Sequence, residues 1–151
     1  MSSRRRAREC ALQALYAADV AGTAGPQALS GVWASRVEGE GDEAPSTPDE
    51  VEFAQEIVRG VLEDRDALDT RIEGASTNWR LGRMPIVDRN ILRIGAFEIV
   101  HRSDIPASVS INEAIELAKR FGGAESRAFV NGILDRIAAD TGRGGRRGKK
   151  G

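Results

Sequence analysis

The stretch that decides the fold is IVDRNILRIGAFEIVH, residues 86–101, which follows Pro85. Its apolar residues recur at helical spacing but point to nearly all sides of the helix instead of one face. They are Ile91, Leu92, Ile94, Phe97, Ile99 and Val100. A helix with this pattern is contacted on several sides, so the sequence predicts a central helix with other helices packed around it.

Helical spacing also dominates the rest of the chain, and no segment alternates with the period of two that is typical of a strand. Further helices are expected over about 3–20, 27–37, 111–121 and 126–140. The apolar stripe that begins at Val51 continues in phase to Leu68 and Ile72. Residues 48–72 therefore form either one long helix or two helices with a break of unassigned position. The predicted fold class is all-α.

Two capping boxes mark where helices begin, because a side chain at each end of the box bonds the backbone N–H of the other. Thr47 and Glu50 frame the first box, with Pro48 at the first helical position, where proline is favoured. Ser110 and Glu113 frame the second. The pattern predicts that a helix starts directly after each of these hydroxyl residues.

The net charge of −1 conceals a separation of charge along the chain. Residues 1–8 hold four arginines and residues 141–151 five basic residues, whereas residues 38–73 hold 13 acidic residues and three arginines. Such a distribution would repel nucleic acid from the acidic segment and orient it toward the basic ends. It also fits an ordinary solvated helix and tail. We expect one folded domain over 1–140 and a disordered basic tail over 141–151.

Composition excludes several classes of protein. A single cysteine, Cys10, rules out an internal disulfide, and with a single histidine, His101, it cannot build a zinc site. Cys10 lies in an Ala/Leu stripe and is expected to be buried and inert. No apolar run is long enough to cross a bilayer, and the basic start lacks the apolar region of a secretory signal. We therefore predict a cytoplasmic protein without catalytic residues, metal or cofactor.

The first helix carries arginines where a helix is least suited to them. Arg4, Arg5, Arg6 and Arg8 fall in its first two turns, where positive charge opposes the helix dipole. The arrangement suits an arriving phosphate, because free N–H groups and guanidinium groups then converge on it. Arg5 and Arg6 lie on the polar side. Arg4 and Arg8 align with the apolar stripe, so their stems are expected to cover apolar surface while their heads extend past the core.

Phe129 is a second candidate for contact with RNA. It lies at the edge of the apolar stripe of the last helix, near Glu125 and Arg136. An aromatic ring there could stack on an unpaired base or pack in the core, and the pattern alone does not decide. Tyr16, on the polar side of the first helix, raises the same question. Arg127 repeats the argument from the helix dipole.

Three segments carry the motifs of a known family. They are RRRARECALQALY (4–16), WRLGRMPIVDRNILRIGAFE (79–98) and the run 105–134, which includes INEAIELAKRFG and SRAFVNGIL. In these segments the chain resembles the NusB family of transcription antitermination factors. The resemblance implies two packed helical bundles of about seven helices. It also implies binding of the single-stranded boxA element of ribosomal RNA transcripts together with NusE, a small-subunit ribosomal protein. Other Nus factors and RNA polymerase would then join to support ribosomal RNA synthesis.

The resemblance also assigns residues by position. The family's RNA contacts fall on its basic start and on the aromatic before Val-Asn-Gly, which here are Arg4, Arg5, Arg6, Arg8 and Phe129. This assignment favours base stacking for the phenylalanine. Lys119 and Arg127 are neighbours of that surface. The surface that faces the protein partner falls around Asp88, with Arg89 and Glu98 as further candidates.

Two other functions stay open. Similar domains form the amino-terminal part of some ribosomal RNA cytosine methyltransferases, but that activity needs an α/β cofactor domain that residues 1–151 do not contain. A pure protein-interaction module is the other alternative, and salt-dependent RNA binding would distinguish it from an RNA-binding adaptor. Some members of the family form homodimers that bury the RNA surface, and the sequence does not decide whether this chain does.

Overall fold

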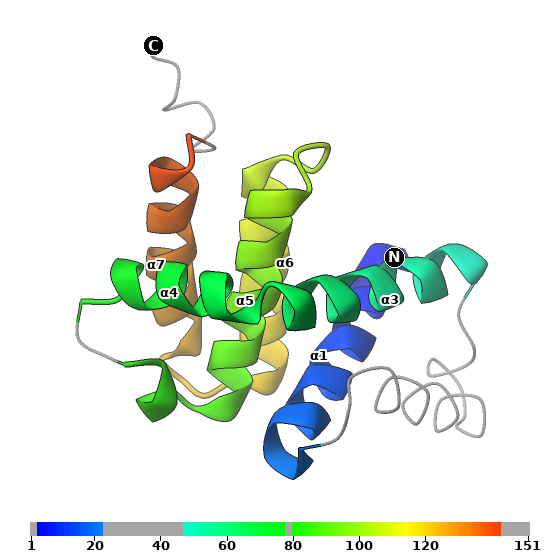
Figure 1. The fold of residues 1–151 in the computed structure, drawn as a ribbon, viewed down its shortest axis with the longest axis horizontal. Helices are drawn as coiled ribbons and strands as arrows, with labels where there is room; N and C mark the ends of the chain where they lie inside the picture. The colour runs from blue at the N-terminus through cyan, green and yellow to red at the C-terminus, as the bar shows by residue number, and fades with distance from the viewer. Residues whose placement is uncertain (1–2, 23–46, 78–79, 143–151) are drawn as a thin grey trace. The chain divides into compact units, whose positions relative to one another are not determined.

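The computed structural model describes residues 3–22, 47–77 and 80–142, and all regular structure within these ranges is helical. The described part contains six α-helices and one short 3-10 helix (Figure 1). The all-α class is thereby confirmed. The helix expected over 27–37 and residues 143–151 of the expected tail lie outside these ranges, so the tail and the domain boundary at residue 140 stay predictions. The chain divides into two compact units, Met1–Glu63 and Asp64–Gly151.

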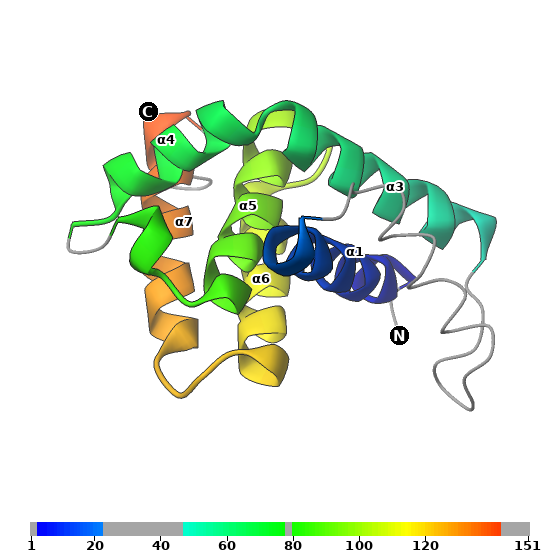
Figure 2. The ribbon, with the colours of Figure 1, turned by 60° about the horizontal axis from the view of Figure 1, so that its bottom comes forward.

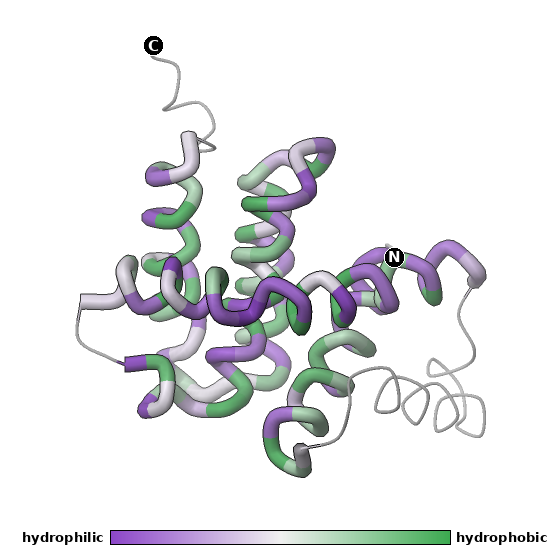
Figure 3. The backbone as a smooth tube through the Cα atoms, in the orientation of Figure 1, coloured by the Kyte–Doolittle hydropathy of each residue, from purple (hydrophilic) through white to green (hydrophobic). Residues whose placement is uncertain are grey.

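The first unit is built from two helices that pack on each other, α1 (Ser3–Ala21) and α3 (Pro48–Glu63). Hydrophobic and hydrophilic residues alternate along both helices (Figure 3), as expected when one side of a helix is buried. The buried apolar residues include Ala7, Cys10, Ala11, Ala14, Leu15, Phe53, Ala54, Ile57, Val58 and Val61. Burial of Cys10 confirms the prediction. Helix α1 ends before Gly22, whose φ of +71° is strained for other residues.

The first capping box forms as predicted. The backbone N–H of Glu50 donates to Oγ1 of Thr47, and the backbone N–H of Thr47 donates to Oε1 of Glu50. Both bonds are 3.2 Å long. Helix α3 ends at Glu63, and α4 (Arg65–Ala75) begins after Asp64. Residues 48–72 therefore form two helices. The break coincides with the boundary between the two units. An apolar stripe that stays in phase therefore does not show that the helix is continuous.

The second unit is organised around α5 (Ile86–His101), which the short helix η2 (Leu81–Arg83) precedes. Helix α5 packs against α4, α6 (Ala107–Phe121) and α7 (Ser126–Asp140). Figures 1 and 2 show α6 and α7 side by side next to α5, with α4 crossing them. Eleven of the 16 residues of α5 are buried. The central helix and its bounds are therefore as predicted, because apolar residues on all its sides find neighbours.

Two buried carboxylates of α5 bond to the helices that follow it. Oγ of Ser110 in α6 donates to Oε1 of Glu98, and Oγ of Ser126 at the start of α7 donates to Oδ1 of Asp88. Both bonds are 2.7 Å long. Ser126 Oγ also accepts a hydrogen bond of 2.9 Å from the backbone N–H of Gly123. These bonds satisfy polar groups that would otherwise be costly to bury.

The prediction of a second capping box, at Ser110 and Glu113, is wrong. Helix α6 begins at Ala107, and Ser110 lies inside the helix with 2% of its surface exposed. Pro106, with φ −57° and ψ 139°, is the residue that precedes the helix. Proline has no backbone N–H, so the group that a capping-box side chain would bond is absent at this position. The hydroxyl of Ser110 is instead available to Glu98, a long-range partner that the local pattern does not reveal.

Gly95 allows α5 and α7 to approach each other closely. A Cβ atom at this position would lie 2.5 Å from Cδ1 of Leu134, which is completely buried. We expect Gly95→Val to lower the free energy of unfolding by about 1–3 kcal/mol, because the packed leucine has little space into which to move. Gly132→Val in α7 is the matched control, since nothing lies within 4 Å of its Cβ position. Equal urea midpoints for the two variants would contradict this explanation.

Candidate nucleic-acid interface

Four arginines at the start of α1, Arg4, Arg5, Arg6 and Arg8, form what we call the arginine cluster, and three of them contact the first two turns of α3. The Cζ atoms of Arg4 and Arg8 lie 4.5 and 5.2 Å from the centroid of the Phe53 ring. Both distances are within the range of a cation–π interaction. One aromatic side chain therefore holds two guanidinium groups at the start of the helix.

A carboxylate in the first turn of α3 holds a third arginine. Nε of Arg6 lies 3.8 Å from Oε2 of Glu50, whose side chain is 4% exposed. The other oxygen of Glu50 accepts the N–H of Thr47 in the capping box. Glu50 therefore both caps the start of α3 and pairs with Arg6. No acidic residue lies in the first turn of α1 itself.

The members of the arginine cluster differ in exposure. Arg4 is exposed, Arg5 and Arg6 are half-buried, and Arg8 is only 3% exposed. The expectation that the head of Arg8 extends past the core is therefore wrong, because the ring of Phe53 offers it a partner within the unit. The importance of Phe53 was missed. Its place on the apolar face of α3 was readable, but its arginine partners depend on how α1 packs against α3.

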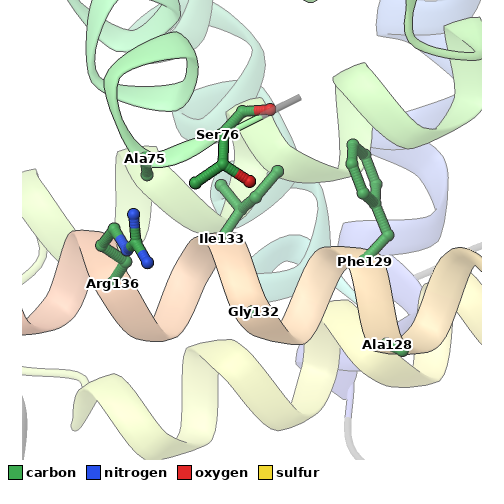
Figure 4. A pocket seen from close by; sticks show the side chains of 8 residues that line it. Ala75, Ser76, Ala128, Phe129, Gly132, Ile133 and Arg136 are labelled. Atoms are coloured by element: carbon green, nitrogen blue, oxygen red, sulfur yellow. The ribbon is translucent and has the colours of Figure 1, made fainter. Parts of the chain in front are cut away.

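A second candidate surface lies where α7 passes the end of α4. It is a shallow pocket of about 260 Å³, which we call the α7 pocket. Its lining is Ala75, Ser76, Thr77, Ala128, Phe129, Gly132, Ile133 and Arg136. Figure 4 shows the Phe129 ring and the Arg136 guanidinium rising from the same side of α7, with Ile133 between them. Aromatic surface, a cation and two hydroxyl side chains thus line one hollow.

The structure does not bring every predicted residue of this region to the pocket. Arg127 is exposed, but it precedes Phe129 by two residues and therefore lies about 200° around the helix from it. Lys119, near the end of α6, is exposed and lies 3.5 Å from Glu116. The cation that shares a face with Phe129 is Arg136, seven residues later.

The remaining predicted residues fall into two groups. Tyr16 in α1 is 41% exposed, so its ring is accessible. Of the residues expected to face a protein partner, Asp88 and Glu98 are only 5% and 1% exposed and bond to serines. Arg89 is half-buried. Asp88 and Glu98 thus have structural partners inside the second unit, whereas Arg89 has accessible surface.

His101 has a structural partner as well. Its Nε2 lies 2.7 Å from Oδ2 of Asp64, and its ring lies 5.5 Å from that of Phe97. Both partners of His101 belong to the second unit. Among the described residues, no group of three or more His, Cys, Asp and Glu could hold a metal ion. No helix of the described ranges is long and apolar enough to cross a membrane.

Comparison with known proteins identifies the family. The model of the NusB family matches residues 5–139. The chain belongs to the NusB family. The transcription antitermination protein NusB of Myxococcus xanthus (strain DK1622) is 51% identical over 138 residues, which cover 91% of this chain and 96% of that protein. That of Sorangium cellulosum (strain So ce56) is 48% identical over 143 residues, with 95% and 96% covered.

Solved structures of NusB proteins have the same fold. T. maritima NusB has a TM-score of 0.79 and 34% sequence identity, covering 96% of this chain and 95% of its own. A structure of the antitermination factors NusB and NusE in complex with dsRNA has a TM-score of 0.79 and 24% identity, covering 93% and 98%. The region matched by the NusB family model includes Arg5, Arg6, Arg8 and the α7 pocket, and it leaves out Arg4 and the basic tail.

Proposed function

We propose that this chain is a non-catalytic RNA-binding adaptor in transcription antitermination. It binds the boxA element of ribosomal RNA transcripts in the cytoplasm together with NusE. Other Nus factors and RNA polymerase complete the assembly. The identity of about half of all aligned residues with NusB antitermination proteins supports this role, and the shared fold with a NusB–NusE–dsRNA complex supports the choice of partners.

The observation that carries the proposal is the arginine cluster at the start of α1, three members of which contact Phe53 or Glu50. Without a ligand, this concentration of positive charge opposes the helix dipole. Bound phosphates would reverse that effect, because guanidinium groups and free backbone N–H groups then face an anion. Arg4, Arg5 and Arg6 are proposed as the phosphate contacts, with Arg8 supporting them from within.

In the second unit, Phe129 supplies the stacking surface. Recognition of unpaired RNA combines cations that hold phosphates with aromatic rings that stack on bases. Phe129 and Arg136 provide this pair in the α7 pocket. Lys119, Arg127 and Tyr16 are proposed as peripheral RNA contacts. Arg89 is proposed to contact NusE, while Asp88 and Glu98 support that surface through their serine bonds.

The proposal is tested by fluorescence anisotropy of a boxA RNA and a scrambled RNA, titrated at several salt concentrations with and without NusE. We expect tighter binding of boxA, a difference that NusE increases, and a linear fall of log affinity with log salt concentration. Equal binding of both RNAs would overturn the boxA assignment. If a homodimer buries the surface, the apparent affinity will depend on protein concentration.

Phe129→Asp is expected to weaken boxA binding by about 10- to 100-fold, since loss of one stacked base costs roughly 1–3 kcal/mol and the new carboxylate repels phosphate. Val109→Asp is the matched control, because Val109 is an exposed apolar residue of the same unit, 41% exposed on α6. The same anisotropy titration measures both. Equal losses in the two variants would show that Phe129 does not contact the RNA.

A further inference from the structure

We infer that Phe53 is a positioning residue for phosphate binding, although it contacts no RNA itself. This inference rests on the proposed function, because it explains how the arginine cluster is made ready for RNA. Phe53 is 4% exposed and lies in the second turn of α3. Its ring is within 5.2 Å of the guanidinium carbons of both Arg4 and Arg8.

The first step of the argument concerns order. A free arginine side chain has many rotamers, and binding a phosphate must restrict them. A ring that holds the guanidinium before RNA arrives reduces this cost, because the side chain is already confined near its bound position. Arg4 is the exposed member of the pair, so it is the arginine that gains most from the contact with Phe53.

The second step concerns charge. Arg8 is 3% exposed and lies against the same ring as the exposed Arg4, so the ring brings two positive charges together at the start of α1. The carboxylate of Glu50 lies 3.8 Å from Nε of Arg6. A ring, unlike a carboxylate, attracts a guanidinium group without adding a negative charge of its own. Phe53 therefore orders two arginines of the cluster and introduces no charge that would compete with phosphate.

The experiment compares Phe53→Leu, which removes the π-face, with Phe53→Tyr, which keeps it. In the full chain, boxA affinity is expected to fall about three- to tenfold in the leucine variant, with a shallower salt dependence, and to stay within about twofold in the tyrosine variant. Ile57→Val is the matched control, because Ile57 is completely buried one turn further along α3. It reduces core packing without touching the arginines.

An NMR readout that needs no RNA accompanies the titration. The side-chain Nε–Hε signals of Arg4 and Arg8 are expected to be displaced by the ring current of Phe53, to move in Phe53→Leu, and to stay in Phe53→Tyr. If Phe53→Leu does not fold, Phe53→Met takes its place, because methionine adapts to core gaps of similar volume.

The outcomes separate the inference from the proposed function. If the wild-type chain prefers boxA and the leucine variant binds as tightly as wild type, the inference is wrong and the function stands. If Ile57→Val loses as much affinity as Phe53→Leu, general packing explains the effect and the inference is again wrong. If the wild-type chain binds no RNA, the proposed function fails and the inference fails with it.

Discussion

Reversing the charges of Arg5 and Arg6 together (Arg5→Glu with Arg6→Glu) is expected to weaken boxA binding by about 100-fold or more. A hydrogen bond to a charged group contributes about 1.5–3 kcal/mol, and two such bonds are lost. The two new carboxylates also repel phosphate. Anisotropy titrations at two salt concentrations measure the loss, and the salt dependence should become shallower because fewer counterions are released.

The matched control for this variant is Arg59→Glu with Arg71→Glu, which changes the net charge by the same amount. Arg59 and Arg71 are exposed residues of α3 and α4, within the acidic segment. We expect their reversal to change the affinity only slightly. Arg6 also lies 3.8 Å from Glu50, so circular dichroism and thermal unfolding must show that both variants remain folded. Similar losses in the two double variants would mean that net charge, and not the arginine cluster, governs RNA binding.

Asp69→Ala is expected to lower the free energy of unfolding by about 3–5 kcal/mol. Nε and Nη2 of Arg93 lie 2.8 and 3.0 Å from the two carboxylate oxygens of Asp69, and the Arg93 side chain is 7% exposed. Removing the carboxylate takes two charge-assisted bonds from a buried guanidinium group, whose Nη1 also donates to the amide oxygen of Asn90 at 3.2 Å. Urea unfolding followed by circular dichroism measures the change.

Asp104→Ala offers a control with the same bond geometry in a different environment. Arg102 donates to both carboxylate oxygens of Asp104, at distances of 2.9 and 2.8 Å, but the Asp104 side chain is 60% exposed. Exposed pairs contribute about 0–1 kcal/mol because water solvates both partners when they separate. A loss in Asp104→Ala as large as that in Asp69→Ala would contradict the view that burial makes the Arg93–Asp69 pair important.

Features with a local cause were predictable from the sequence. The central helix over 86–101 followed from apolar residues on all of its sides, and the structure packs three helices around it. The Thr47–Glu50 box followed from two side chains that bond each other's backbone across one turn. Both predictions succeed because the interacting groups are neighbours in the sequence or repeat with the period of the helix.

The errors share a different cause. Ser110 was taken as a cap and is a buried partner of Glu98, 12 residues earlier. Arg8 was expected to extend past the core and lies against Phe53, 45 residues later. In each case the side chain has a local role that fits its type and a long-range partner that satisfies it better. No pattern in a single sequence reveals which alternative the packing selects.

The sequence by itself determined the helical class, the extents of the central and last helices, the burial of Cys10 and membership of the NusB family, because periodicity, caps and motifs are carried by residues close together. Only the tertiary structure decided which side chains are buried and with whom. It placed Phe53 beneath two arginines, Asp88 beside Ser126, and Glu98 beside Ser110. These pairings arise where helices meet, and the free energy of such contacts depends on burial and geometry, which the packing creates.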